Sequence, residues 1–128
     1  MDEKRVIETD LAPPAVGPYS QAIVAGGFVF LSGQVPLDPA TGRLIESEDV
    51  GDHVARCFEN LKAVLEAAGS DLDRAVKVTL YLADIHDYRA ANEAYARYFG
   101  EAPPARAAFQ VARLPLNARV EIDMIALA

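Results

Sequence analysis

Two strand-like segments of this chain are apolar along both of their faces, which restricts how it can fold. Residues 28–31 include no polar side chain, and residues 76–82 are nearly as apolar. Side chains of a strand alternate between the two faces of its sheet, so both faces of this sheet require cover. The chain has only two helical patterns, enough for one face. We therefore expect the other face to pack against further copies of the chain in a closed cyclic assembly.

The remaining periodicities predict one domain over residues 1–128, a length that supports a single hydrophobic core. Gly26-Gly27 predicts a tight hairpin, and Gly69 ends the first helical pattern. The order is β-β-β-α-β-α-β-β, which favours an α+β fold with both helices on one face of a mixed sheet. The predicted strands are 5–8, 20–25, 28–32, 74–83, 107–112 and 119–127, the predicted helices are 48–68 and 85–99, and 36–42 is a turn-rich loop.

The last two strands are predicted to form a terminal hairpin, because only the turn-like segment 113–118 separates them. If their apolar faces point the same way, Arg106 and Glu121 converge on the opposite face. An arginine there is suited to gripping a small carboxylate, and a glutamate to proton transfer or water placement. A structural ion pair has the same spacing and is the more common arrangement, so both interpretations stay open.

Composition argues against several classes of partner. The net charge is −7 and the twelve basic residues are scattered, which disfavours nucleic acid. Cys57 is the only cysteine, so the chain has no internal disulfide, as suits a reducing cytosol. The first residues lack the apolar stretch of a signal peptide, and no apolar run approaches the ~20 residues that span a bilayer. We expect a cytoplasmic protein that does not bind membranes.

The chain also lacks the motifs of metal and cofactor sites. His53 and His86 do not have metal-ligand spacing, and no cysteine pair is present. The glycines at 26 and 27 are not followed by those of a phosphate-binding loop, and there is no G-x-S-x-G motif. We predict no metal and no organic cofactor.

Three further positions have both a structural and a functional interpretation. Tyr19 stands in a Gly-Pro turn and either packs on the surface or presents its hydroxyl to a pocket. Ser32 and Gly33 end an apolar strand, where a glycine allows close approach of a ligand or marks a simple turn. Asn92 interrupts the apolar side of the second helix, as a satisfied core group or as a ligand contact.

Several segments in register resemble the reactive-intermediate (enamine/imine) deaminase family, called RidA or YjgF. The resemblance covers nearly the whole chain, and its last block is the most specific. The matching residues are Gly17-Pro18-Tyr19-Ser20-Gln21, Ser32-Gly33-Gln34-Val35-Pro36, 38–42, 60–69, Pro104-Ala105-Arg106, 111–115 and 120–122.

The resemblance implies a chorismate-mutase-like fold and a homotrimer with clefts between its subunits. It implies hydrolysis of 2-imino and enamine acids, released by pyridoxal-phosphate-dependent dehydratases, to 2-keto acids and ammonia. Arg106 then binds the substrate carboxylate. The residues that shape the cleft or place the water are Tyr19, Ser32, Gly33, Asn92 and Glu121.

One position departs from the family pattern, since Ala108 stands where many members have a cysteine. Water attack assisted by Glu121 does not need that thiol. Two other functions remain: a non-catalytic protein that binds small carboxylates such as keto acids, and an endoribonuclease. The acidic charge disfavours the endoribonuclease.

Overall fold

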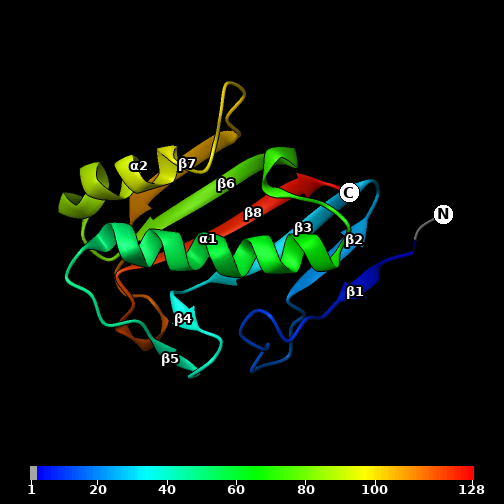
Figure 1. The fold of residues 1–128 in the computed structure, drawn as a ribbon, viewed down its shortest axis with the longest axis horizontal. Helices are drawn as coiled ribbons and strands as arrows, with labels where there is room; N and C mark the ends of the chain where they lie inside the picture. The colour runs from blue at the N-terminus through cyan, green and yellow to red at the C-terminus, as the bar shows by residue number, and fades with distance from the viewer. Residues whose placement is uncertain (1–2) are drawn as a thin grey trace.

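The computed structural model describes residues 3–128, in which a six-stranded sheet is covered on one side by two α-helices (Figure 1). A two-stranded sheet of β4 and β5 lies beside it. The elements are β1 (Arg5–Ile7), β2 (Ala22–Ala25), β3 (Phe28–Gln34), β4 (Leu37–Asp38), β5 (Arg43–Leu44), α1 (Val50–Ala67), β6 (Ala75–Leu82), α2 (Tyr88–Ala96), β7 (Ala105–Gln110) and β8 (Val120–Leu127). The predicted α+β class, with a mixed sheet and two helices, is confirmed.

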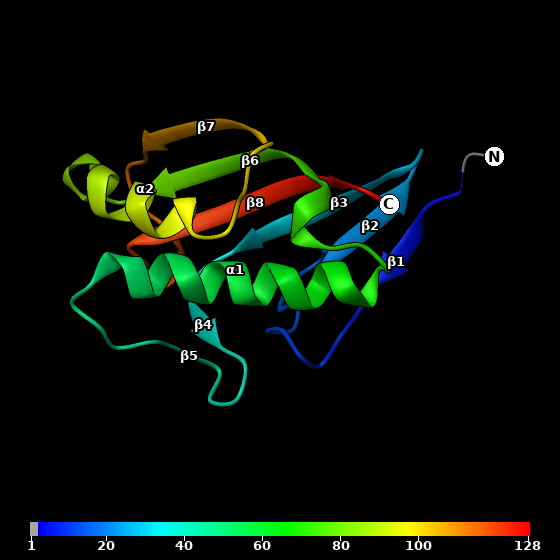
Figure 2. The ribbon, with the colours of Figure 1, turned by 45° about the horizontal axis from the view of Figure 1, so that its top comes forward.

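The strands of the main sheet lie in the order β1-β2-β3-β8-β6-β7 (Figure 2). Neighbours are antiparallel except β6 and β7, which are parallel and are connected through α2. The predicted terminal hairpin is wrong, because β6 lies between β7 and β8. The chain returns from α2 beside β6, at the edge of the sheet. β8 enters the middle, where Val120, Ile122 and Met124 are buried.

The core fills the space between the sheet and the helices. Asp49 caps α1 by accepting a hydrogen bond from the Gly51 N–H at 2.8 Å. The buried side of α1 carries Phe58 and Leu61, which are fully excluded from solvent. The Phe58 ring packs edge-on against Tyr95 of α2, with centroids 5.5 Å apart. This contact fixes α2 against α1 and so sets the position of the side chains that α2 turns toward β7.

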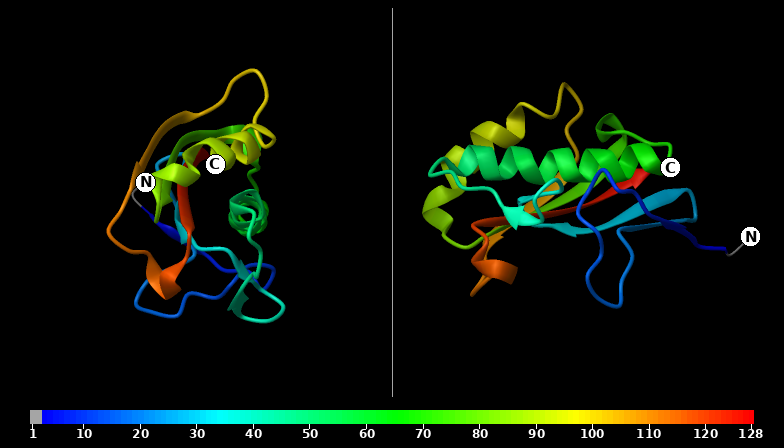
Figure 3. Two further views of the ribbon diagram at one scale, coloured as in Figure 1. Left: turned by 90° about the vertical axis from the view of Figure 1, so that its left-hand side faces the viewer. Right: turned by 60° about the horizontal axis from the view of Figure 1, so that its bottom comes forward.

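The opposite side of the main sheet, here named the uncovered face, is not covered by either helix; Figure 3 shows α1 end-on, on one side of the strands. Its side chains include Val6, Phe30 and Phe109, which are 56%, 44% and 44% exposed. Phe30 lies opposite Ile125 of β8, so the apolar surface continues across neighbouring strands. Residues 28–31 and 76–82, which carry apolar side chains on both faces, predict such an apolar face that the two helices leave uncovered.

The structure shifts some predicted boundaries. The predicted loop 36–42 includes β4 and begins the turn to β5, where Gly42 has φ +73°. The predicted helix 85–99 starts as a 3₁₀ turn at Ile85–Asp87, because the Asp84 carboxylate accepts from the His86 N–H, and α2 ends at Ala96. Within residues 3–128, no helix is long and apolar enough to cross a membrane.

Candidate active site

Arg106 lies on β7 and points toward α2, on the helix-covered face of the sheet. Its Nη1 donates to Asn92 Oδ1 at 2.7 Å, and its Nη2 donates to the Tyr88 hydroxyl at 2.7 Å. The guanidinium carbon sits 4.6 Å from the centre of the Tyr95 ring. Positions 88, 92 and 95 fall on one side of a helix, so α2 presents all three groups together.

These contacts leave donors free on the guanidinium. Each terminal nitrogen of an arginine carries two N–H groups, and each contact uses one. The remaining N–H groups on Nη1 and Nη2 suit the two oxygens of a carboxylate. Arg106, Tyr88 and Asn92 are named here the arginine half-site. Ala108 borders it, in a cavity of about 520 Å³ that also touches Ile85.

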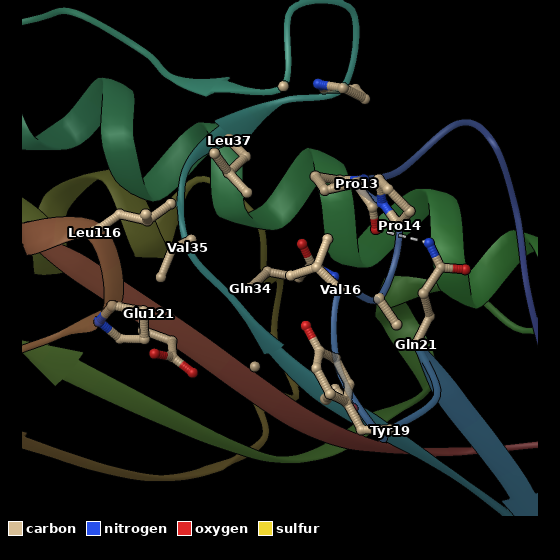
Figure 4. Close-up of a pocket in the computed structure, with 16 residues that line it drawn as sticks. Pro13, Pro14, Val16, Tyr19, Gln21, Gln34, Val35, Leu37, Leu116 and Glu121 are labelled. Atoms are coloured by element: carbon tan, nitrogen blue, oxygen red, sulfur yellow. Dashed lines mark hydrogen bonds between the residues drawn. The ribbon is translucent and has the colours of Figure 1, made fainter.

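Glu121 lies on β8 on the uncovered face, where it is paired with Tyr81 of β6. Its carboxylate reaches into a cavity of about 690 Å³, named here the glutamate cavity (Figure 4). The predicted residues Tyr19, Ser32 and Gly33 line the same cavity. The other lining residues are Pro13, Pro14, Ala15, Val16, Gln21, Gln34, Val35, Leu37, Pro39, Gly42, Pro115 and Leu116.

The environment of Glu121 favours its protonated form. Partial burial raises the pKa of this carboxyl group, and the nearby charge of Asp123 raises it further. Within residues 3–128, Glu121 forms no salt bridge. A carboxylate whose pKa is raised toward neutrality is a better general base at physiological pH.

The other lining residues differ in what they can offer. The Tyr19 hydroxyl points into the cavity from the turn before β2 (Figure 4). The Ser32 hydroxyl donates to the Ser20 carbonyl at 2.6 Å, so its oxygen is left to accept. Gln21 lines the cavity, but its amide is engaged with the backbone of Thr9 and Pro13 and holds the first loop in place.

Gly33 allows Glu121 to occupy its position. A Cβ at residue 33 would clash with Glu121 Oε2 and would lie 3.0 Å from Glu121 Cδ. The β3 backbone is irregular at this point, since its register with β8 shifts between Leu31 and Gln34. The glycine predicted to permit close approach therefore accommodates a side chain of the chain itself.

The prediction that Arg106 and Glu121 share one face is wrong for a single chain. Arg106 is paired with Val78 and turns toward the helices, whereas Glu121 turns the other way. Two strand spacings and about three residues of rise separate their backbones by roughly 14 Å. Phe109 takes the uncovered face of β7 and packs edge-on against Tyr81, with centroids 5.4 Å apart. This packing fixes which side chains of β7 point to the uncovered face and which point toward the helices.

The structural ion-pair interpretation is wrong for one chain for the same reason. The salt bridges of the described residues do not join Arg106 to Glu121. The structure groups the candidate residues into two separate sets. Asn92 joins Arg106 in the arginine half-site, and Tyr19, Ser32 and Gly33 join Glu121 in the glutamate cavity.

Tyr88 is a residue of the site that the sequence alone does not single out. Its spacing of four residues from Asn92 is the signal that relates it to a polar group on the same side of α2. Cys57 is fully buried, and burial raises the pKa of its thiol, so it is a packing residue. No cluster of three potential metal ligands occurs between residues 3 and 128.

Comparison with known proteins agrees with the fold. The model of the family described as Endoribonuclease L-PSP matches residues 9–128. A RutC family protein of Pyrococcus horikoshii is 51% identical over 96% of this chain and 97% of its own length. The human 2-iminobutanoate/2-iminopropanoate deaminase is 44% identical over 97% of this chain and 90% of its own length.

A solved structure gives the same relationship. The crystal structure of RidA from the Antarctic bacterium Psychrobacter sp. PAMC 21119 superposes with a TM-score of 0.91 at 44% identity, covering 97% of this chain and 99% of that one. The fold is therefore that of the L-PSP and Rid structures. The chain belongs to the RidA family, also called the YjgF family.

Proposed function

We propose that this protein is a 2-iminobutanoate/2-iminopropanoate deaminase, which hydrolyses reactive imines to 2-keto acids and ammonia. One observation carries the proposal: Arg106 has two N–H groups free for a carboxylate, and Glu121 is half-buried without a salt bridge in residues 3–128. Both are held in place, but on opposite faces of one sheet. The first suits a carboxylate and the second a water molecule. The human relative, at 44% identity, is named for this reaction.

The proposal includes a homotrimer with clefts between its subunits. Arg106 lies on the edge strand of the sheet, and Glu121 lies on the apolar uncovered face. When the edge of one copy packs on the uncovered face of the next, the two half-sites of different copies can meet on one substrate. The exposed side chains of Phe30 and Phe109 support such packing. The family resemblance supplies the number three, and cyclic symmetry closes the assembly.

In the proposed mechanism, Arg106 binds the carboxylate of the 2-imino acid through its free N–H groups. Glu121 of the neighbouring copy takes a proton from water as the oxygen attacks C2 of the protonated imine. The resulting carbinolamine receives that proton on nitrogen. The C–N bond then breaks and ammonia leaves, while the Glu121 carboxylate takes the hydroxyl proton and the carbonyl forms. Since a protonated imine is already electrophilic, this route requires no metal and no organic cofactor.

The proposal is tested by generating 2-iminopropanoate freshly in the presence and absence of the protein. We expect pyruvate and ammonia to form faster with the protein, and chelator to leave the acceleration unchanged. Keto-acid binding without any acceleration would favour the non-catalytic carboxylate-binding function, to which Arg106 is equally suited. The endoribonuclease function rests on the description of the matching family model, and the net charge of −7 disfavours it.

We expect Asp123→Asn to shift the acid limb of the pH profile to lower pH. The charge of Asp123 adds to the effect of burial in raising the pKa of Glu121, so removing that charge lowers this pKa. The ionised form of Glu121 is the active one, and it then persists to lower pH. An asparagine oxygen can still accept the hydrogen bond that Tyr81 donates at 2.7 Å. The pH dependence of kcat/KM checks this, and an unmoved or raised acid limb contradicts it.

We expect Gly33→Ala to lower kcat/KM by roughly 10-fold, because Glu121 must rotate away from its position over β3. The backbone at residue 33 does not have a positive φ, so alanine adds no conformational strain there. Thermal denaturation should therefore change little. Gly100→Ala is the matched control, since a Cβ at residue 100 meets no atom within 4 Å. Equal activity of the Gly33 and Gly100 variants would contradict the placement of Glu121.

A further inference from the structure

The turn that precedes β8 holds a leucine in an unusual backbone conformation. Leu116 has φ +59° and Asn117 has φ +56°, and every other positive φ within residues 3–128 belongs to a glycine. Asparagine is tolerated in this left-handed region, but a leucine there is uncommon. Two backbone hydrogen bonds close the turn, from the Asn117 N–H to Leu114 O and from the Ala118 N–H to Pro115 O, both at 3.1 Å.

This backbone conformation presents the Leu116 side chain to the glutamate cavity. The side chain is not used in the core, since Leu116 is 64% exposed. It lines the cavity beside Val35, on the same side as Glu121 (Figure 4). Leucine is disfavoured in this backbone conformation, and in the single chain the Leu116 side chain adds nothing to the core. Its position at the cavity calls for another explanation.

The wall that Leu116 extends is apolar. Val35, just after β3, and Leu37 of β4 continue it, and Pro13, Pro14 and Val16 face it from the first loop. In the single chain the cavity holds about 690 Å³, which is more room than the carboxylate and imine carbons of a three-carbon acid require. The part of the cavity next to Leu116, Val35 and Leu37 therefore suits an apolar group.

We propose that Leu116 is a specificity-determining residue, which forms the wall that receives the side chain of the substrate and favours 2-imino acids with a branched apolar side chain. The inference deepens the proposed function and rests on it for the choice of substrate. An added methylene in a hydrophobic pocket is worth ~10-fold or more in discrimination when it is well enclosed. Because Leu116 borders an open cavity, we expect a total preference of about 10-fold for a four-carbon branched side chain over an ethyl group.

The test compares two substitutions in the same turn. Leu116→Asn replaces the apolar wall with a polar group that accepts the left-handed conformation, so the turn is retained. Asn117→Gly is the matched control, because it also suits a positive φ and residue 117 does not line the cavity. Binding of 2-oxobutanoate and 4-methyl-2-oxopentanoate is measured by calorimetry on all three proteins, with kcat/KM for the two corresponding imines and thermal denaturation.

We expect the parent and Asn117→Gly to bind the branched acid about 10-fold more tightly, and Leu116→Asn to lose most of that preference while staying as stable as the parent. The kcat/KM ratios should follow the binding ratios. An unchanged ratio in Leu116→Asn, or no preference in the parent, overturns the inference. If the parent hydrolyses neither imine, the proposed deaminase function fails, while the keto-acid binding ratio still decides the role of Leu116.

Discussion

Replacing Glu121 with glutamine is expected to lower imine turnover by about 10²–10⁴-fold and to leave the affinity for 2-oxobutanoate nearly unchanged. Glutamine keeps the size of the side chain and its ability to hydrogen-bond, but it cannot take a proton near neutral pH. Glu121 reaches into an apolar cavity and has no salt-bridge partner in residues 3–128, so its charge is left for the reaction. Turnover and calorimetric binding are measured on one preparation.

The folded state should tolerate this change. Because the pKa of Glu121 is raised on folding, the folded chain binds more protons than the unfolded one between the two pKa values. The free energy of unfolding therefore falls as the pH rises through that window, and ionised Glu121 opposes folding at neutral pH. Glutamine should thus not reduce thermal stability at pH 7. A loss of turnover under 10-fold would assign Glu121 to water orientation, and preserved turnover would remove it from the reaction.

Arg106→Lys is expected to lower kcat/KM by ~10–100-fold, nearly as much as Arg106→Ala. Lysine keeps the charge but has a single nitrogen. It cannot bind Asn92 and Tyr88 at 2.7 Å each and also present two parallel donors to a carboxylate. Steady-state kinetics on freshly generated 2-iminobutanoate measure the loss.

The matched control for this variant is Arg89→Lys. Arg89 lies on the same helix as Asn92, and its side chain is 94% exposed. This control should keep the parental activity. If Arg106→Lys hydrolyses the imine at the parental rate, the carboxylate is not held by a planar pair of donors.

Most of the secondary structure follows from the sequence, because burial imposes a period on it. The helical pattern of residues 48–68, ended by Gly69, predicts α1, and Gly26-Gly27 predicts the β2–β3 hairpin that the structure contains. The pairing of β7 does not follow. Ala107 and Phe109 mark an apolar face of β7, but the sequence does not show that this face lies on the opposite side of the sheet from Val120 and Ile122. Because α2 connects β6 to β7, β7 pairs with β6 and not with β8.

The sequence identifies the candidate residues one by one, but it does not divide them between the arginine half-site and the glutamate cavity. Arg106 and Glu121 stand out by residue type, yet the faces they occupy depend on β6 lying between their strands. The contribution of Leu116 is also hidden in the sequence, since leucine carries no mark of a left-handed backbone. Tyr88 could have been related to Arg106 only after β7 was placed beside α2.

The central claim, that one site is built from two copies of the chain, is tested most directly by combining two inactive variants. Arg106→Ala and Glu121→Gln are co-expressed with different tags, and mixed assemblies carrying both tags are isolated. Light scattering establishes that they have three times the 13.8 kDa chain mass. Each mixed trimer, with one or two copies of either variant, has one of its three sites built from an intact Arg106 and an intact Glu121, so we expect about one third of the parental imine turnover. Mixed trimers that stay as inactive as the separate variants would contradict the account.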